Sequence, residues 1–252
     1  MADSATGRLA LDLETISPNV PPDRKPDFSN PRQFEVFIVG VGYQSEPGKP
    51  IDVEALVRTG IGPDAELNVI ERALDWIDER DADTLLTYNG DEFDLGLLLE
   101  RTRIAAEEST AGRRELLDRV NALLERCESD DLKPACWDAF GDYTRFEDAC
   151  AVAGVDCPTT HWAEYDHPME PDNWRRPEHR GKSELVNADV PEFGERYLRL
   201  LDAGNEGEPV VEELHRMLTE YTLGDVKPLF ELADARPFDG NGDESKSPPI
   251  AE

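Results

Sequence analysis

The sequence has few cysteines and no long hydrophobic run. None of the four cysteines shows Cys-x-x-Cys spacing, so no thioredoxin-like motif is indicated. Cys157, His161 and His167 are candidate zinc ligands, but their spacing fits no common zinc site, and we favour scattered structural residues. Nothing resembles a secretion signal or a run of about 18 apolar residues. We therefore expect no membrane segment and a cytoplasmic protein with reduced thiols.

Basic residues are also scarce. The chain has 26 Lys and Arg, six of them Lys, against 56 Asp and Glu, and its formal net charge of -30 is spread along its length. Such self-repulsion destabilises a fold at low salt, whereas in about 1 M salt the Debye length is only about 3 Å. The composition therefore indicates a halophilic protein, adapted to molar salt. Phosphate binders usually carry a basic footprint, but counterion release contributes little in such a medium, so a nucleic-acid partner is not excluded.

A length of 252 residues suits one α/β domain with tails. Apolar residues recur at helical spacing over 63–81, where Leu67, Ile70, Leu74 and Ile77 form one stripe. Similar patterns predict the other elements. We expect strands over 9–15, 34–43, 51–56, 84–88 and 133–140, and helices over 63–81, 91–106 (with Asp91 as N-cap), 113–127, 144–153, 190–202 and 209–223, the last continuing to about 233.

The order of these elements predicts the architecture. Strands dominate the first third of the chain, helices the last, and the two alternate between. We expect a mixed sheet flanked by helices, in which an antiparallel meander continues into parallel strands. The domain should span 8–234, with an irregular insertion over 156–187, a flexible N-terminus over 1–7 and a disordered acidic tail over 235–252.

Three acidic stretches carry the chemical theme of the sequence. Asp12 and Glu14 lie two residues apart in the apolar strand 9–15, so their side chains share one face. The other two stretches are Asn89 to Asp94, at a strand-to-helix turn, and Tyr221 to Asp225, on a late helix. Gathered carboxylates are costly unless cations compensate them. Hard divalent cations such as Mg²⁺ take oxygen ligands, and two of them can catalyse phosphodiester displacement.

The same stretches resemble the motifs of the DEDD superfamily of 3′–5′ exonucleases, which have a ribonuclease H-like fold. The match consists of Asp-x-Glu at 12–14, Asn-x-x-x-Phe-Asp at 89–94 and Tyr-x-x-x-Asp at 221–225, the last in its tyrosine-type variant. The segment 88–94, with Arg101 after it, is especially similar to the proofreading domains of family B DNA polymerases, and 137–140 with 152–154 also resembles them. The resemblance touches most of residues 8–233 and is poorest over 156–187.

This resemblance implies a metal site and a catalytic tyrosine. Asp12, Glu14, Asp94 and Asp225 would hold two Mg²⁺ or Mn²⁺ ions, and Tyr221 would orient the attacking water. The geometry is plausible from the residues alone, because positions i and i+4 share a helix face. A phenol has an unperturbed pKa near 10, so Tyr221 suits hydrogen bonding better than general-base work. The alternative for Tyr221 is a half-buried core residue.

Three further residues are candidate substrate contacts: Thr15, Asn89 and Phe93. Thr15 can meet the terminal nucleotide through its backbone or hydroxyl. Asn89 either contacts substrate or closes its own turn, since Asn-Gly is a common turn pair, and Phe93 is either a stacking wedge or a core residue. Lys182 and the pair 175–176 either touch phosphates or form ordinary surface.

The sequence therefore predicts a metal-dependent 3′–5′ exonuclease acting on single-stranded nucleic acid, with DNA favoured over RNA. Any proofreading role would need a separate replication or repair partner. The alternative is an accessory or nucleic-acid-binding protein that keeps the fold with little turnover. The complete acidic set argues against it, but one feature leaves it open: Gly224 and Pro228 are both unfavourable in a helix, and a kink there would change the relative position of Tyr221 and Asp225.

Overall fold

The computed structural model describes residues 7–21, 24–165, 173–175 and 177–238. These residues build a five-stranded mixed sheet with strand order β3-β2-β1-β4-β5. β1 pairs antiparallel with β2, and β2 with β3, while β1, β4 and β5 run parallel. The predicted meander that continues into parallel strands is confirmed. The strands are β1 (Gly7–Ile16), β2 (Glu35–Gln44), β3 (Asp52–Val57), β4 (Ala82–Thr87) and β5 (Glu128–Asp131).

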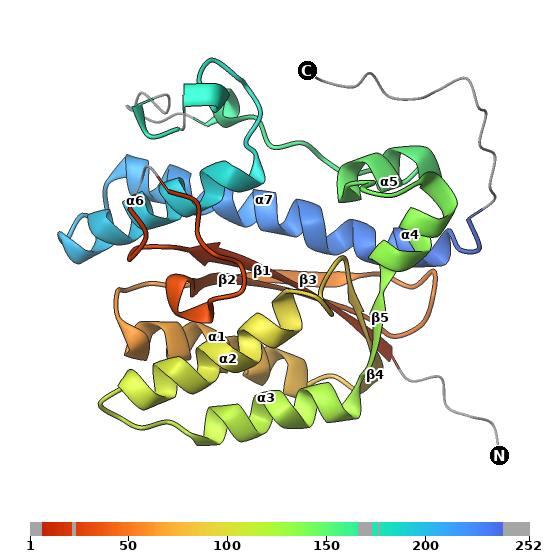
Figure 1. The fold of residues 1–252 in the computed structure, drawn as a ribbon, viewed down its shortest axis with the longest axis horizontal. Coiled ribbons are helices and arrows are strands. Elements are labelled where there is room, and N and C mark those ends of the chain that lie inside the picture. The colour runs from red at the N-terminus through yellow and green to blue at the C-terminus, as the bar shows by residue number, and fades with distance from the viewer. Residues whose placement is uncertain (1–6, 22–23, 166–172, 176, 239–252) are drawn as a thin grey trace.

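Helices cover both faces of the sheet (Figure 1). On one face lie α1 (Pro63–Asp78), α2 (Asp94–Glu108) and α3 (Glu115–Arg126), and on the other lie α6 (Val190–Asp202) and α7 (Pro209–Asp234). Two shorter helices, α4 (Leu132–Phe140) and α5 (Phe146–Ala153), follow β5. Segment 156–187 is irregular, as expected, in its described part. Within the described residues, no helix has both the length and the apolar character that a membrane crossing requires.

Alternate side chains of β1 lie on opposite faces of the sheet, as the strand period of two predicts. Leu9, Leu11 and Leu13 join the hydrophobic core beneath α1, α2 and α3. Ala10 packs instead among residues of α7 on the opposite face. Asp12 and Glu14 therefore point toward the α6 and α7 side of the sheet. The pairing with β2 shifts between Glu14 and the next residue, a β-bulge of the kind found beside functional sites.

Glycines in β2 let α7 approach the sheet closely. Gly40 is the register partner of Asp12. A Cβ on Gly40 would lie 2.6 Å from side-chain methyl carbons of both Thr222 and Val226 on α7. A Cβ on Gly42 would lie 2.6 Å from a ring carbon of Phe230, one turn further along α7. The absence of these two side chains therefore brings the helix that carries Asp225 close to the strand that carries Asp12.

Helix α7 is not interrupted at Gly224 and Pro228, the point where the sequence allows a kink. The helix runs as one element from 209 to 234, with Pro228 inside it. A proline removes the hydrogen bond to the carbonyl four residues earlier, here that of Gly224. The Cys157 thiol lies 3.9 Å from this carbonyl oxygen and donates to it. Cys157 therefore compensates in part for the lost bond, and Tyr221 and Asp225 stay on one continuous helix.

Two predictions are wrong: the strand over 133–140 and the helix start at Asp91. Residues 133–140 form helix α4, not a strand, because Asp131 caps the helix by accepting from the Lys133 N–H and Pro134 fits a first turn. The strand is the preceding β5, which has no apolar side chain to signal it. Helix α2 begins at Asp94 with Phe93 as N-cap, so Asp91 is not the cap.

The two ends of the domain also differ from expectation. Gly7 already belongs to β1. Residues 235–238 are packed: Arg236 forms an ion pair with Asp130, and the Phe238 ring stacks 4.9 Å from that of Phe140. The rest of the predicted tail, 239–252, and most of the predicted flexible N-terminus, 1–6, lie outside the described residues.

Replacing Gly40 by alanine tests the close approach of α7. The added methyl has no room, so we expect Gly40→Ala to lower the free energy of unfolding by about 1–3 kcal/mol. Gly96→Ala is the matched control, because Gly96 is exposed in α2 and a Cβ there meets nothing within 4 Å. It should stabilise the protein by about 0.5–1 kcal/mol. Thermal unfolding in molar salt measures both, and equal shifts for the two variants would contradict the account.

Candidate metal centre and nucleic-acid cleft

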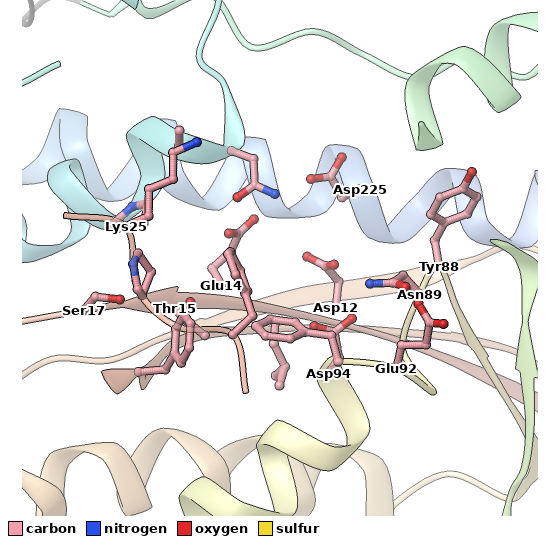
Figure 2. Close-up of a pocket in the computed structure, with 18 residues that line it drawn as sticks. Asp12, Glu14, Thr15, Ser17, Lys25, Tyr88, Asn89, Glu92, Asp94 and Asp225 are labelled. Carbon is pink, nitrogen blue, oxygen red and sulfur yellow. The ribbon is translucent and has the colours of Figure 1, made fainter. Parts of the chain in front are cut away.

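Three carboxylates meet between β1 and α7. Asp12 and Glu14 project from β1, and Asp225 projects toward them from α7 (Figure 2). One carboxylate oxygen from each residue can be chosen so that all three lie within 4.8 Å of one another. Mg²⁺ binds oxygens at about 2.0–2.1 Å, so two ligand oxygens on opposite sides of one ion are about 4.2 Å apart. Small side-chain movements would thus let the three carboxylates share an ion.

The fourth predicted ligand lies beside this group. Asp94 is the first residue of α2 and lines the same cavity as Asp12 and Glu14. It is not a member of the three-residue group. Burial raises its pKa, and the charge of Asp12 raises it further. Asp94 is therefore close enough to Asp12 to share its electrostatic environment, in a place that suits a ligand of a second ion.

The four carboxylates are costly to ionise together. Glu14 and Asp94 are each only 7% exposed. Burial raises the pKa of Asp12 to about 6, and burial followed by the charges of its acidic neighbours raises that of Glu14 well above its usual range. The pKa of Asp225 is raised by burial and then by Asp12. Among the described residues, none of the four forms an ion pair with Lys or Arg, so a bound cation is the compensation that the site invites.

A capped turn holds Asp94 in place. The Asp131 carboxylate accepts the Asn89 N–H at 2.8 Å and also caps α4. Asn89 has a φ of 73°, and a Cβ on the next residue, Gly90, would lie 2.4 Å from Thr87. The pair Asn-Gly is therefore required by the turn itself, which delivers the chain to the start of α2.

Asn89 has a second role at the surface of the cleft. Its side-chain oxygen accepts from the ammonium of Lys133, which also pairs with Glu92 at 2.6 Å. Asn89 lines the cavities on both sides of Asp12. It thus closes its own turn, the alternative favoured by its sequence, and also borders the space where a ligand would lie.

The first cavity, of about 690 Å³, extends from the acids toward an aromatic cluster. The Phe93 ring lies 5.7 Å from that of Phe28 and 5.8 Å from that of Phe34. All three line the cavity, as does Thr15. Phe28 is 68% exposed, which is unusual for so large an apolar ring. Phe93 is half-buried and contacts both the exposed Phe28 and the buried Phe34, so it lies at the border between the cavity and the core.

The second cavity, of about 590 Å³, lies along α7. Tyr221, Asp225 and Asp12 line it. Burial raises the pKa of Tyr221, and the charges of Glu14, Asp225 and Asp12 raise it further. Tyr221 also packs against the apolar cluster around α6 and is half-buried. It therefore has the packing role that the core alternative describes, and it also lines the cavity beside the acids. Its hydroxyl stays protonated at neutral pH.

Several cleft residues escaped the sequence analysis. Lys25 and Phe28 lie in the loop after β1, and Asn187 lies between the two cavities, since it lines both. Two of them carried a signal in the sequence. Lys25 is one of only six lysines in the chain, and Phe28 is an aromatic residue in a loop rich in Pro and Asp. Asn187 had no such signal, because it lies in an aperiodic segment.

One predicted surface residue is instead buried. Arg175 has no exposed side-chain area and pairs with Asp189 at 2.8 Å, so it does not reach a phosphate. Lys182 is exposed, and residue 176 lies outside the described part of the chain. The suggested zinc ligands Cys157 and His161 join no metal-binding group among the described residues, and His167 is not described.

Asp12 makes the metal-free stability pH-dependent. Its pKa lies near 6 in the fold and near 3.8 when unfolded, so the native state binds more protons between these values. Stability conferred by the protonated carboxyl is therefore present at low pH and is lost as pH rises through about 6. Asp12→Asn should raise the free energy of unfolding by about 1–3 kcal/mol above pH 7 and little below pH 4. Thermal unfolding with EDTA in molar salt measures this.

Asp142→Asn is the control for that experiment, because Asp142 is exposed and distant in sequence from the acidic stretches. It should leave stability unchanged within about 0.5 kcal/mol at either pH. A gain for Asp12→Asn that is equal at pH 4 and above pH 7 would contradict an unfavourable buried charge at this position.

Comparison with known proteins gives this site no relative. No protein-family model matches the sequence, and no curated protein matches it. What the site does must therefore be judged from its own chemistry. That chemistry is a set of buried oxygen donors suited to hard divalent cations, between an aromatic cavity and a polar one.

Proposed function

We propose that this protein is a metal-dependent exonuclease that removes nucleotides from the 3′ end of a single strand. The observation that carries the proposal is the group formed by Asp12, Glu14 and Asp225, with Asp94 beside it. These residues come from three separate parts of the chain, and each belongs to one of the motifs that resemble the DEDD superfamily. Chance motif matches give no reason for the three stretches to meet in one cleft.

The fold is consistent with the same proposal. A mixed sheet flanked by helices is the class to which ribonuclease H-like proteins belong, and we assign the chain to that fold on the motifs and the architecture together. The continuity of α7 through Pro228 supports an active enzyme over a non-cleaving relative. Tyr221 and Asp225 keep the i, i+4 relation that the third motif requires.

The donor set fits two Mg²⁺ or Mn²⁺ ions, which when bound would activate a water and stabilise the leaving oxygen. Asp12, Glu14 and Asp225 would hold one, and Asp12 with Asp94 the other. Tyr221 keeps its proton and donates a hydrogen bond, which orients the water rather than deprotonating it. Glu14 and Asp94 are nearly enclosed, so water has limited access to the reacting centre from their side.

The substrate is a single strand, with DNA favoured over RNA by the resemblance to proofreading domains. Bases can stack on Phe28 and Phe93, which contact the buried ring of Phe34, and such stacking tolerates any sequence. Thr15 and Asn89 line the cavity beside the acids, which supports their proposed role as contacts of the terminal nucleotide. The net charge requires salt to screen repulsion from the strand. We assign the protein to the cytoplasm of a halophile, acting with a replication or repair partner.

End-labelled strands test the activity directly. In molar KCl with Mg²⁺ or Mn²⁺, the wild-type protein should shorten a 5′-labelled single strand stepwise, and EDTA should stop it. Asp12→Ala should reduce the rate by at least about 1,000-fold, because removal of a central metal ligand removes several kcal/mol of transition-state stabilisation. Asp142→Asn should cleave as the wild type does.

Activity that persists in Asp12→Ala, or that survives EDTA, would contradict the proposal. Metal-dependent binding of strands without any cleavage, across single- and double-stranded DNA and RNA, would support the accessory role instead. Release of internal fragments before single nucleotides would indicate an endonuclease.

Tyr221→Phe distinguishes a tyrosine that orients the attacking water from one that removes a proton from it. Loss of one hydrogen bond to the reacting water should lower kcat about 10- to 100-fold and leave KM nearly unchanged. The pH dependence of the residual activity should keep its shape, because the tyrosine stays protonated throughout the neutral range. Initial rates from pH 6 to 9 measure this, and loss of an alkaline limb in the variant would show that Tyr221 titrates.

A further inference from the structure

The irregular segment before α6 forms one wall of the second cavity. His179 lies in a short 3-10 helix (Pro177–His179), and Asn187 begins another (Asn187–Asp189). Both line the cavity that contains Tyr221 and Asp225. These residues belong to the part of the chain where the exonuclease resemblance is poorest, and no motif accounts for them.

A fully buried ion pair holds this wall in shape. Arg175 and Asp189 have no exposed side-chain area and are joined at 2.8 Å. Arg175 also donates to the backbone carbonyls of Lys182 and of Glu184, the latter at 2.6 Å. The oxygen of Asp189 that meets Arg175 accepts the Val186 N–H at 3.1 Å as well. One pair therefore fixes the chain on both sides of His179.

The other oxygen of Asp189 faces His179. His179 Nδ1 and Asp189 Oδ1 lie 3.6 Å apart, and each is buried without a hydrogen-bond partner among the described residues. A buried polar atom without a partner is unfavourable, because it has lost its hydrogen bonds to water. Both atoms are satisfied if Nδ1 carries a proton and the two atoms move a few tenths of an ångström closer, so that Nδ1–H donates to Asp189. The edge of the ring that carries Nε2 then remains for the cavity.

We propose that His179 binds a backbone phosphate of the nucleic-acid strand, with the Arg175 and Asp189 pair as its positioning brace. In the complex Nδ1–H donates to Asp189, and Nε2–H donates to a phosphate oxygen. This inference rests on the proposed function, and it adds a contact for the strand beyond the metal centre.

The polar lining of the cavity supports a phosphate over an apolar ligand. Phosphate oxygens only accept hydrogen bonds, and groups that can donate line the cavity: Arg145, Thr159, Thr160, His179 and Asn187. Four carboxylates line it as well, those of Asp12, Glu147, Glu184 and Asp225, of which Asp12 and Asp225 belong to the proposed metal ligands. A donor held in place by a buried carboxylate loses little entropy on binding.

Two substitutions separate the phosphate contact from the brace. An asparagine amide occupies about the place of Nδ1, so His179→Asn keeps a donor for Asp189 and removes the cavity edge. A glutamine amide reaches about as far as Nε2, so His179→Gln keeps a donor for the phosphate. His161→Asn is the matched control, because His161 lies in the same segment but does not line the cavity.

Binding is measured by fluorescence anisotropy in the inactive Asp12→Ala background, with a labelled single strand in molar salt. We expect His179→Asn to weaken binding about 10-fold, His179→Gln to restore it within about 3-fold, and His161→Asn to leave it unchanged. An uncharged methylphosphonate at one linkage should weaken binding to the parent but not to His179→Asn, because the two changes remove one interaction. Thermal unfolding confirms that each variant is folded.

The inference is overturned if His179→Asn binds as tightly as the parent, or if every methylphosphonate weakens both proteins equally. A cleavage assay of the wild-type protein on the same strand reports on the proposed function separately. Cleavage by the wild type with no effect of His179→Asn rejects the phosphate contact alone. Binding that depends on His179 without wild-type cleavage rejects the exonuclease and keeps the contact. If neither the Asp12→Ala parent nor its His179→Asn variant binds a strand, and the wild type does not cleave it, both the phosphate contact and the exonuclease are rejected.

Discussion

The site depends on the close approach of α7 to the sheet. Asp12 lies on β1 and Asp225 on α7, and their carboxylates meet because Gly40, opposite Asp12 on β2, presents no side chain to the helix. A methyl group at that position would push the helix outward. The same approach gathers acids that repel one another and lose solvation. Packing of the apolar face of α7 therefore offsets an electrostatic cost, as is common where function requires a strained arrangement.

Much of this arrangement follows from local sequence. The alternation in β1 predicts that Asp12 and Glu14 share a face opposite the leucines, and the spacing in α7 predicts that Tyr221 and Asp225 share a helix face. Helices α1, α3, α6 and α7 begin and end within about three residues of expectation, because their apolar stripes are regular. The mixed sheet follows from the order of elements.

The remainder depends on contacts that a local pattern does not contain. Strand β5 has only polar side chains and exists because the edge of β4 pairs with it. The proline in α7 is tolerated because the Cys157 thiol, from a distant loop, meets the carbonyl that Pro228 leaves without a partner. Arg175 looked like a surface cation, but its partner Asp189 buries it completely. In each case the partner lies outside the local pattern, 14 residues away for Arg175 and 67 residues away for the carbonyl that Cys157 meets, so the wall of the second cavity is the part least predictable from sequence.

We propose that Asp12, Glu14, Asp94 and Asp225 hold two divalent cations. An anomalous difference map, collected at the manganese edge from crystals grown with Mn²⁺ and a nucleoside monophosphate, tests this. Two peaks are expected about 3.5–4 Å apart, one among Asp12, Glu14 and Asp225 and the other between Asp12 and Asp94. A map with no peak at these carboxylates, or with manganese bound only elsewhere, would contradict it.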